Sequence, residues 1–553
     1  MRSLAILKKE VLLNSAKTIF KTILYRIVLK HLTRRSVEKK CRKAKELINS
    51  PKVSLVSFDV FDTCIIRSSY LPSDVQKYMD ANHLKCIEEA EKEMAHARKC
   101  IQDLYQYAVN VGKRVIAVSD MYLGSDVLSD LLINCGYHDF SHIYVRCECG
   151  TTKSNDTFFN DVARSEKVPP KAILHIGDDM VSDWWRAKKS GWQAVCIPSA
   201  YNYFICSSFK AATFVKENFK TWEDRSVFNF VLDRCEDEGG LSFKRGTLNV
   251  RTFAVACLFP YLYRIADFLI YNPEVNADYE KIYFLSRDGY LPMKAYNMMR
   301  DYVHKGLEAE YLYGSRYTLH IEKIDDEDKI RRIGQYYKET IKLKEGRALV
   351  YDTGYSGTTS KIADYFDYPC KIDKVYLWQR NANKQEDKKR GTRTLCLLGD
   401  LPNQWLIFYE SILSDNRRGS VEDIYKKDKI YEPVCNKIVE LHNELEELTM
   451  MQEKALSTLF SFLDNWEIRH IECNYNLSLS FVLLMRHYLS GINPRNYRFL
   501  HNIYYEDQFS DNLFKIPHLD YFIIKMKMNE SKIAYCMKSM IFRYYKKLFV
   551  SVQ

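Results

Sequence analysis

Polar side chains able to bind and act on a ligand follow several apolar runs in the first half of the chain. The run SLVSFDVFDT carries Asp59 and, three residues later, Asp62, and the run RVIAVSDMYL carries Ser119. A third run, AILHIGDDMVSD, ends in a set of three acids. The three acids are Asp178, Asp179 and Asp183, and Lys153 stands just before a helical pattern. Four strand-end polar groups in this order are a strong signal of a functional site.

The apolar runs themselves are typical of central parallel strands, because they are short, continuous and rich in β-branched residues. Open α/β sheets bind their ligands at the C-terminal ends of such strands. We therefore expect residues 51–205 to form an α/β domain whose parallel sheet gathers the polar side chains at one edge. The helical pattern of residues 68–112, between the first two runs, predicts a small helical cap.

The order and content of these runs resemble the four motifs of the haloacid dehalogenase-like (HAD) hydrolase superfamily, over roughly residues 53–200. The resemblance implies a Rossmannoid sheet, a Mg²⁺ cofactor, and attack on phosphorus by an aspartate that becomes an aspartyl phosphate. It assigns the nucleophile to Asp59, the contacts to phosphoryl oxygens to Ser119 and Lys153, and Mg²⁺ to Asp59, the backbone carbonyl of Phe61, and Asp178 with Asp179 or Asp183.

One position departs from the phosphatases of this superfamily. They usually carry a second aspartate two residues after the nucleophile, which protonates the leaving group, and here that residue is Phe61. An aromatic residue there resembles the dehalogenases, but those lack the paired metal-binding acids, so phosphoryl transfer is favoured. General acid catalysis contributes about 100- to 10,000-fold. Three explanations stay open: a substrate with a good leaving group, substitution by Asp62, or a degenerate domain that only binds.

A second set of strand-like runs follows the loop CEDEGGLSFKRGT. The pattern predicts a helical linker over residues 206–250 and, where strands and helices alternate, a second α/β domain over residues 251–435. Two strand ends, FLSRDG and DTGYSGTT, offer hydroxyls and backbone N–H groups to an anion and faintly resemble the phosphate loops of phosphoribosyltransferases. Phosphate or nucleotide-sugar binding is expected there, at Ser286, Arg287, Asp288, Asp352, Ser356, Gly357, Thr358 and Thr359.

Positive charge is concentrated near the ends of the chain. Residues 1–50 hold 14 Lys and Arg against 3 Asp and Glu, which equals the net charge of +11 of all 553 residues. This distribution, without a recognisable nucleic-acid module, argues against nucleic-acid binding. Apolar residues recur between the basic ones at helical spacing, which predicts an amphipathic helix that either packs on its own domain or adsorbs to an anionic membrane surface. Residues 436–553 are predicted to form a helical, basic C-terminal region.

The sequence favours a cytoplasmic protein. The run TFAVACLFPYLYRIADFLIY comes nearest to the roughly 18 to 20 uncharged residues of a membrane span, but it contains Arg264 and Asp267. The 16 cysteines form no metal-type pairs, and the first residues show no cleavable signal pattern. We therefore expect a cytoplasmic location, with peripheral attachment to the inner membrane face if residues 1–50 bind lipid.

The combined architecture is similar to predicted HAD-type hydrolases associated with bacterial surface-polysaccharide synthesis. It implies a Mg²⁺-dependent phosphohydrolase or phosphotransferase acting on a sugar phosphate or a phosphorylated glycan intermediate. Two alternatives stay open. One is a non-catalytic HAD-like scaffold that docks a glycosyltransferase at the membrane, and the other is a sugar- or ribosyl-phosphate transferase activity in the second domain.

Overall fold

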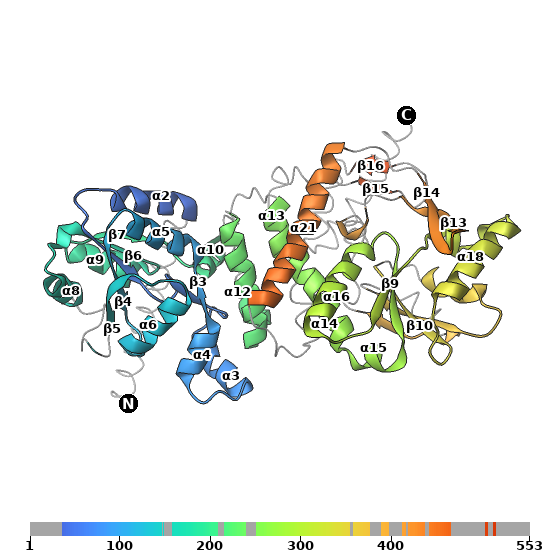
Figure 1. Cartoon of the computed structure of the whole chain (residues 1–553), viewed down its shortest axis with the longest axis horizontal. Helices are drawn as coiled ribbons and strands as arrows, with labels where there is room; N and C mark the ends of the chain where they lie inside the picture. The colour runs from blue at the N-terminus through green and yellow to red at the C-terminus, as the bar shows by residue number, and fades with distance from the viewer. Residues whose placement is uncertain are drawn as a thin grey trace, which may run out of the picture. The chain divides into compact units, whose positions relative to one another are not determined.

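Figure 1 shows the computed structural model of the chain, which divides into two compact units, Met1–Arg245 and Gly246–Gln553. The structure describes residues 36–145, 148, 157–207, 215–238, 250–353, 358–376, 389–396, 412–415, 419–436, 442–465, 504–506 and 513–515. The amphipathic stretch predicted near the N-terminus lies outside these residues. Within residues 1–50 the described helix is α2 (Val37–Ile48).

The first unit is built on a five-stranded parallel sheet of order β5-β4-β1-β6-β7. The chain runs outward from the central strand β1 to β4 and β5, and then crosses back to β6. The C-terminal ends of β1 and β6 therefore form the topological switch point where open α/β sheets bind ligands. The predicted parallel α/β fold is confirmed. The strands are β1 (Leu55–Asp59), β4 (Arg114–Ser119), β5 (Phe140–Val145), β6 (Ile173–Gly177) and β7 (Gln193–Cys196).

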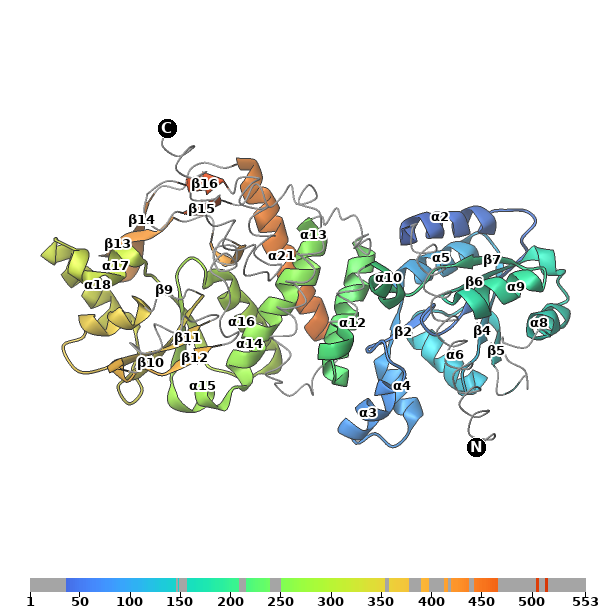
Figure 2. The same ribbon diagram turned by 180° about the vertical axis from the view of Figure 1, so that it is seen from behind.

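Helices cover both faces of this sheet (Figure 2). Successive residues of β1 face opposite sides, so Val56 and Phe58 pack in one apolar core and Leu55 packs in the other. Burial on both sides explains why the strand is apolar, apart from Ser57, until it reaches Asp59. One layer contains α2, α5 (Lys99–Asn110) and α6 (Ser125–Asn134), and the other contains α8 (Phe158–Glu166) and α9 (Arg186–Lys189).

The cap is smaller than the predicted one. It consists of the antiparallel strands β2 (Ile65–Arg67) and β3 (Ala95–Ala97) with helices α3 (Asp74–Ala81) and α4 (Ile87–Met94) between them. Helix α5, which falls inside the predicted cap of residues 68–112, packs on the sheet beside α2 instead. Helical periodicity is the same in both places, so the pattern could not separate a cap helix from one that covers the sheet.

Helix α12 (Trp222–Asp237) is part of the first unit and not of a linker, which the sequence predicts over residues 206–250. Most of its residues are buried, so it lacks the broad polar face that marks a surface helix in a sequence. It contacts both the cap and the region beside the sheet. These contacts are Arg225 to Asp74 of α3, Asn229 to the Arg67 carbonyl at 2.7 Å, and Glu236 to Arg98 at 2.7 Å.

The second unit contains another five-stranded parallel sheet, of order β12-β11-β10-β8-β9. The chain passes from β8 to β9 on one side and then to β10 on the other, so β8 and β10 form a second switch point. The prediction of a second α/β sheet is confirmed. The strands are β8 (Lys281–Leu285), β9 (Glu308–Leu312), β10 (Arg347–Asp352), β11 (Lys371–Tyr376) and β12 (Thr394–Cys396).

Apolar helices pack against one another in this unit. Helix α14 (Phe259–Tyr271) contacts α16 (Tyr290–Val303) and α21 (His442–Asn465), which is the described helix of the predicted C-terminal region. The stretch Val250–Tyr271 is long and apolar enough to cross a membrane, but 94% of its most apolar window is buried in the protein. Two of its charged residues, Arg264 and Asp267, form a buried ion pair of 2.9 Å. This environment is typical of a core helix.

Shorter elements complete the described structure. They are α10 (Ala200–Ser207), α13 (Val250–Phe253), α15 (Pro273–Asp278), α17 (Arg316–Leu319), α18 (Glu327–Thr340), the π-helical turns η2 (Met180–Trp185) and η3 (Ala254–Leu258), the 3₁₀ helices η1 (Pro170–Ala172), η4 (Ile321–Lys323) and η5 (Thr358–Tyr365), and the strand pairs β13 (Val421–Lys427) with β14 (Ile430–Cys435) and β15 (Tyr504–Glu506) with β16 (Leu513–Lys515).

Replacing Arg98 with Met should lower the free energy of unfolding of the first unit by about 3 to 5 kcal/mol, because Glu236 would keep a buried charge without its partner. Arg98 is 1% exposed, and its five N–H groups all donate, to Glu236 and to three backbone carbonyls. Urea unfolding measures the change. The matched control is Arg42→Met, which breaks an exposed pair with Glu38 worth about 1 kcal/mol or less. Equal losses for the two variants would contradict the role given to Arg98.

Candidate active site

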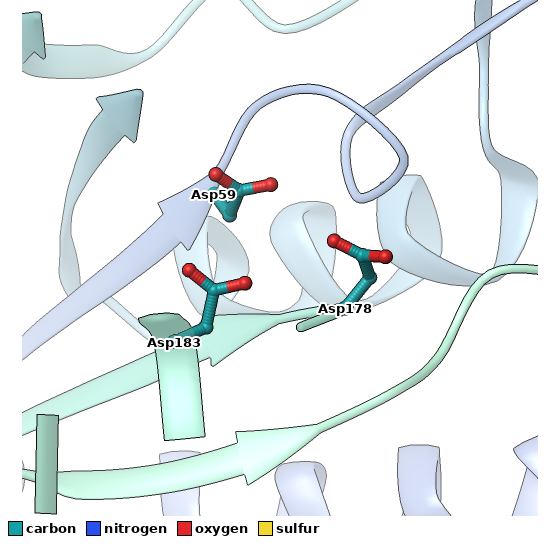
Figure 3. A group of neighbouring side chains, drawn as sticks. All are labelled: Asp59, Asp178 and Asp183. Carbon is teal, nitrogen blue, oxygen red and sulfur yellow. The ribbon is translucent and has the colours of Figure 1, made fainter. Parts of the chain in front are cut away.

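Three aspartates lie together at the switch point of the first sheet (Figure 3). Asp59 ends β1, Asp178 directly follows β6, and Asp183 lies in the π-helical turn η2 that comes next. One carboxylate oxygen from each lies within 4.8 Å of those of the other two. Figure 3 shows the three carboxylates around a common space. Carboxylate oxygens grouped in this way suit a hard divalent cation.

Gly177 lets the turn η2 fold back over the end of β6. A Cβ atom at this position would lie 2.4 Å from Cγ of Asp183 and 2.5 Å from its Cβ. Real Cβ atoms do not approach other atoms so closely, so a side chain at position 177 would displace Asp183. The glycine in the run HIGDD is therefore part of the site, although it offers no ligand.

A buried histidine orients Asp183. His175 lies on β6, fully buried, with Nδ1 2.9 Å from the Ser57 hydroxyl and Nε2 3.4 Å from Oδ1 of Asp183. If Ser57 donates to Nδ1, the ring proton is on Nε2 and faces the carboxylate. The backbone N–H of Asp179 donates to the other oxygen of Asp183 at 3.0 Å. His175 could not be recognised as part of the site from the sequence, because a histidine within an apolar run resembles any other interior strand residue.

Asp179 has a different task from Asp183. Its Oδ1 accepts hydrogen bonds from the backbone N–H groups of Val181 and Ser182, both at 2.7 Å, and from the Ser182 hydroxyl at 2.9 Å. These bonds satisfy free N–H groups at the start of η2, as an N-cap does. Of the two acids that the sequence offers as the partner of Asp178, the structure brings Asp183 into the group and uses Asp179 as a cap.

Negative charge is crowded at this site. Burial raises the pKa of Asp178 well above its usual value, and the nearby carboxylates of Asp62, Asp183 and Asp59 raise it further. Without a cation, the protonated form of Asp178 is therefore favoured. The effect of Asp62 on Asp178 also places that acid beside the group.

Asp62 lies in the tight loop after β1. Its backbone adopts the left-handed conformation at φ 58°, its N–H donates to the Ile65 carbonyl at 2.7 Å, and its carbonyl accepts from Arg98 at 3.1 Å. Burial raises the pKa of its carboxyl, while Arg67 and Arg98 act in the opposite direction. The loop thus holds a carboxyl that keeps its proton more readily than an exposed aspartate.

Of the other residues predicted for this site, the structure describes Ser119 and Phe61. Ser119 ends β4, the strand beside β1, and its buried hydroxyl accepts a hydrogen bond from the Met121 N–H at 3.3 Å. The ring of Phe61 packs against the Arg67 guanidinium at 4.1 Å, and the metal contact predicted for its carbonyl stays a prediction. Lys153 lies outside the described residues.

The second switch point also gathers predicted residues, but its described part is acidic. Asp288 follows β8 and Asp352 ends β10; burial and then the Asp352 charge raise the pKa of Asp288 to about 7. The Thr359 hydroxyl donates to Asp352, and the Ser286 hydroxyl to a backbone carbonyl. Arg287 donates to the Ser420 hydroxyl at 3.0 Å, Thr358 begins η5, and Ser356 and Gly357 lie outside the described residues. Phosphate binding here stays a prediction.

Comparison with known proteins does not assign a family. No protein-family model matches the chain, and no curated protein matches it significantly. An uncharacterized protein from Listeria monocytogenes serotype 4b is 18% identical over 26% of this chain and 82% of its own, with a TM-score of 0.21. A putative tagatose-6-phosphate ketose/aldose isomerase from Clostridium novyi NT is 9% identical over 83% of this chain and 86% of its own, with a TM-score of 0.15. Structural likeness this low supports no assignment.

Replacing Asp183 with Asn should weaken the binding of Mn²⁺ by about 10-fold or more, because a carboxylate ligand becomes a neutral amide. Asp179→Asn is the matched control, since asparagine caps a helix as well as aspartate does, and the affinity should hardly change. Electron paramagnetic resonance of free Mn²⁺ measures both dissociation constants. The reverse order of effects would show that Asp179 is the ligand.

Metal binding should tighten as the pH rises. The raised pKa of Asp178 means that the metal-free protein keeps a proton there, and a cation must displace this proton. Binding therefore releases protons, and its affinity falls as the pH drops below that pKa. Calorimetric titration in two buffers with different ionisation enthalpies measures the protons released. An affinity that is independent of pH, with no proton release, would contradict the proposed role of Asp178.

Proposed function

We propose that the first unit is a Mg²⁺-dependent phosphohydrolase or phosphotransferase with Asp59 as its nucleophile. The convergence of Asp59, Asp178 and Asp183 at the switch point of a parallel sheet carries this proposal. Ser119, at the end of the neighbouring strand, adds a hydroxyl at the same edge. The resemblance of the sequence motifs to HAD hydrolases gives the same residues these roles.

The donor set fits a hard divalent cation. Three carboxylates offer oxygen atoms within 4.8 Å of one another, and Asp59 and Asp183 are buried. Mg²⁺ would supply the positive charge that offsets the repulsion between these acids and a phosphate ester. The raised pKa of Asp178 supports this fit, because it reflects a site rich in negative charge.

Each residue of the site has a separate role in the proposed reaction. The Asp59 carboxylate would attack phosphorus and break the bond to the leaving oxygen, which leaves the phosphoryl group on an oxygen of Asp59. Water, or another acceptor hydroxyl, would then attack the same phosphorus and restore the carboxylate. The Ser119 hydroxyl would donate to a phosphoryl oxygen, and Lys153 would neutralise one.

Asp62 is the proposed proton donor to the leaving oxygen. Phe61, which occupies the position of the usual acid, has no proton to give, and its ring packs against Arg67. Asp62 is the next residue, and burial raises its pKa, so the protonated form needed of a general acid is favoured. After donating its proton, Asp62 would take one from the incoming water.

The finer identity of the reaction rests on the sequence. The motif resemblance suggests a sugar phosphate or a glycan intermediate in surface-polysaccharide synthesis as the substrate. Composition suggests a cytoplasmic protein, and the basic segment 1–50 suggests attachment to an anionic membrane face.

Asp59→Asn should abolish Mg²⁺-dependent phosphatase turnover while the fold is kept, because an amide of the same shape is a poor nucleophile. Phosphate release from a panel of sugar phosphates and from p-nitrophenyl phosphate measures turnover, and circular dichroism checks the fold. Asp103→Asn, an exposed residue of α5, is the control and should behave as the wild type. Wild-type turnover by the Asp59 variant would remove Asp59 from the mechanism.

Asp62→Asn should slow the hydrolysis of alkyl phosphates by about 100- to 10,000-fold. It should affect p-nitrophenyl phosphate far less, because that leaving group needs no proton. The ratio of kcat/KM for the two ester classes measures the difference. Equal losses on both esters would mean that Asp62 does not protonate the leaving group.

A further inference from the structure

A cavity of about 170 Å³ is lined in part by Asp62. Its described walls come from the loop after β1, from the cap strand β2 and the segment after it, from the start of α5, and from α10 and α12, all within the first unit. Asp62 lines the cavity and also acts electrostatically on Asp178. Asp62 follows Asp59 by three residues in the loop after β1, so a group that leaves phosphorus at Asp59 would enter this space. Its lining includes Tyr70, Arg98, Tyr201, Asn229 and Asp233.

We propose that this cavity holds the leaving group of the substrate and selects a neutral, hydroxyl-rich group the size of one monosaccharide. This assignment depends on the proposed phosphoryl transfer at Asp59 and specifies its substrate class. Helices α10 and α12, which follow the sheet in the sequence, would then determine which leaving group is accepted, together with the small cap.

Among the described residues, the lining of the cavity offers no free cation for a second anionic group. Arg98 is the one cation among the described residues that line it, and its five N–H groups all donate to Glu236 and to backbone carbonyls. Three carboxylates line the same space, from Asp62, Asp233 and Glu236. A leaving group that carries a phosphate or carboxylate would face these acids without a cationic partner, at a large cost in desolvation.

The polar lining matches hydroxyl groups. Asp233 is 5% exposed and burial raises its pKa to about 7, so near neutral pH its carboxyl either accepts or donates a hydrogen bond. One of its oxygens pairs with Arg234 at 2.9 Å. Asn229 uses its Nδ2 on the Arg67 carbonyl, which leaves Oδ1 as an acceptor. Hydroxyls both donate and accept, so they suit this mixture better than a group that only donates.

The aromatic wall and the volume set the size of the ligand. Tyr70 and Tyr201 stack with ring centroids 4.1 Å apart and an interplanar angle of 9°. Such rings provide apolar surface for the C–H groups of a sugar ring. The volume corresponds to about five or six water molecules at roughly 30 Å³ each. A cavity of this volume fits one six-membered ring. Pockets for drug-sized ligands, which are closer in size to nucleotides, have volumes of about 300 to 1,000 Å³.

The test compares leaving groups on the full chain with Mg²⁺. The probes are glucose 6-phosphate, 3-phosphoglycerate and phosphoethanolamine, whose leaving groups are neutral, anionic and cationic. Glucose 6-phosphate should have a kcat/KM about 10-fold or more above the other two, roughly the discrimination of one lost pairing of about 1.4 kcal/mol. A preference for either charged leaving group would overturn the proposal.

Variants of the lining locate the selection. Asp233→Asn keeps the shape of the carboxyl, and Tyr201→Leu removes half of the stacked pair. Both should raise KM for glucose 6-phosphate about 10-fold with a smaller change in kcat, because they alter binding and leave Asp59 in place. Glu223→Gln, on the first turn of the same helix α12 and outside the cavity lining, is the control. Circular dichroism and Mn²⁺ affinity confirm that each variant is folded.

The outcomes separate this proposal from the proposed function. If turnover depends on Asp59 but the lining variants match Glu223→Gln, the cavity is not the leaving-group site and the phosphatase assignment stands. If no phosphate ester is turned over in an Asp59-dependent way, the proposed function fails and the cavity assignment fails with it.

Discussion

Like charges that are crowded together determine the organisation of the first unit. Asp59, Asp178 and Asp183 offer oxygens within 4.8 Å of one another. Two carboxylates at that separation repel by about 3 kcal/mol even at an effective dielectric constant of 20. The protein does not relieve this repulsion by keeping the acids apart, and it adds Asp62 beside them. Such a site favours a bound proton or a bound cation. The proposed reaction uses such a cation, because it offsets the repulsion between these acids and a phosphate ester.

Neighbouring elements keep the acids in place against that repulsion. Gly177 gives Asp183 room against the end of β6, and His175 and the Asp179 N–H hold its two oxygens. Farther out, Arg98 connects the loop after β1 to α12 through its bonds to the Asp62 carbonyl and to Glu236. A rigid outer shell of this kind fixes the geometry of a metal or catalytic site. The same helix α12 lines the cavity beside Asp62, so it would support both the site geometry and the proposed selection of the substrate.

The sequence predicts the strands and their polar ends well because a central parallel strand is a continuous apolar run, and its C-terminal end is where ligands bind. That reasoning gives both sheets and brings Asp59 and Asp178 together. It does not separate Asp183 from Asp179, because a ligand and an N-cap at adjacent turns have the same residue type. It also misses His175 and α12, whose roles depend on contacts between segments distant in sequence. For the second sheet, the loop that would show a phosphate cradle lies outside the described residues.

The most direct test of the central claim needs no knowledge of the substrate. Beryllium fluoride forms a phosphoryl-like adduct with a carboxylate nucleophile when a divalent cation is at hand. Fluorine NMR of the full chain with beryllium fluoride and Mg²⁺ should show bound resonances, which disappear when Mg²⁺ is removed and in the Asp59→Asn variant. Bound resonances that persist in the Asp59→Asn variant, or none in the wild-type protein at saturating Mg²⁺, would contradict the assignment of Asp59 as a metal-assisted nucleophile.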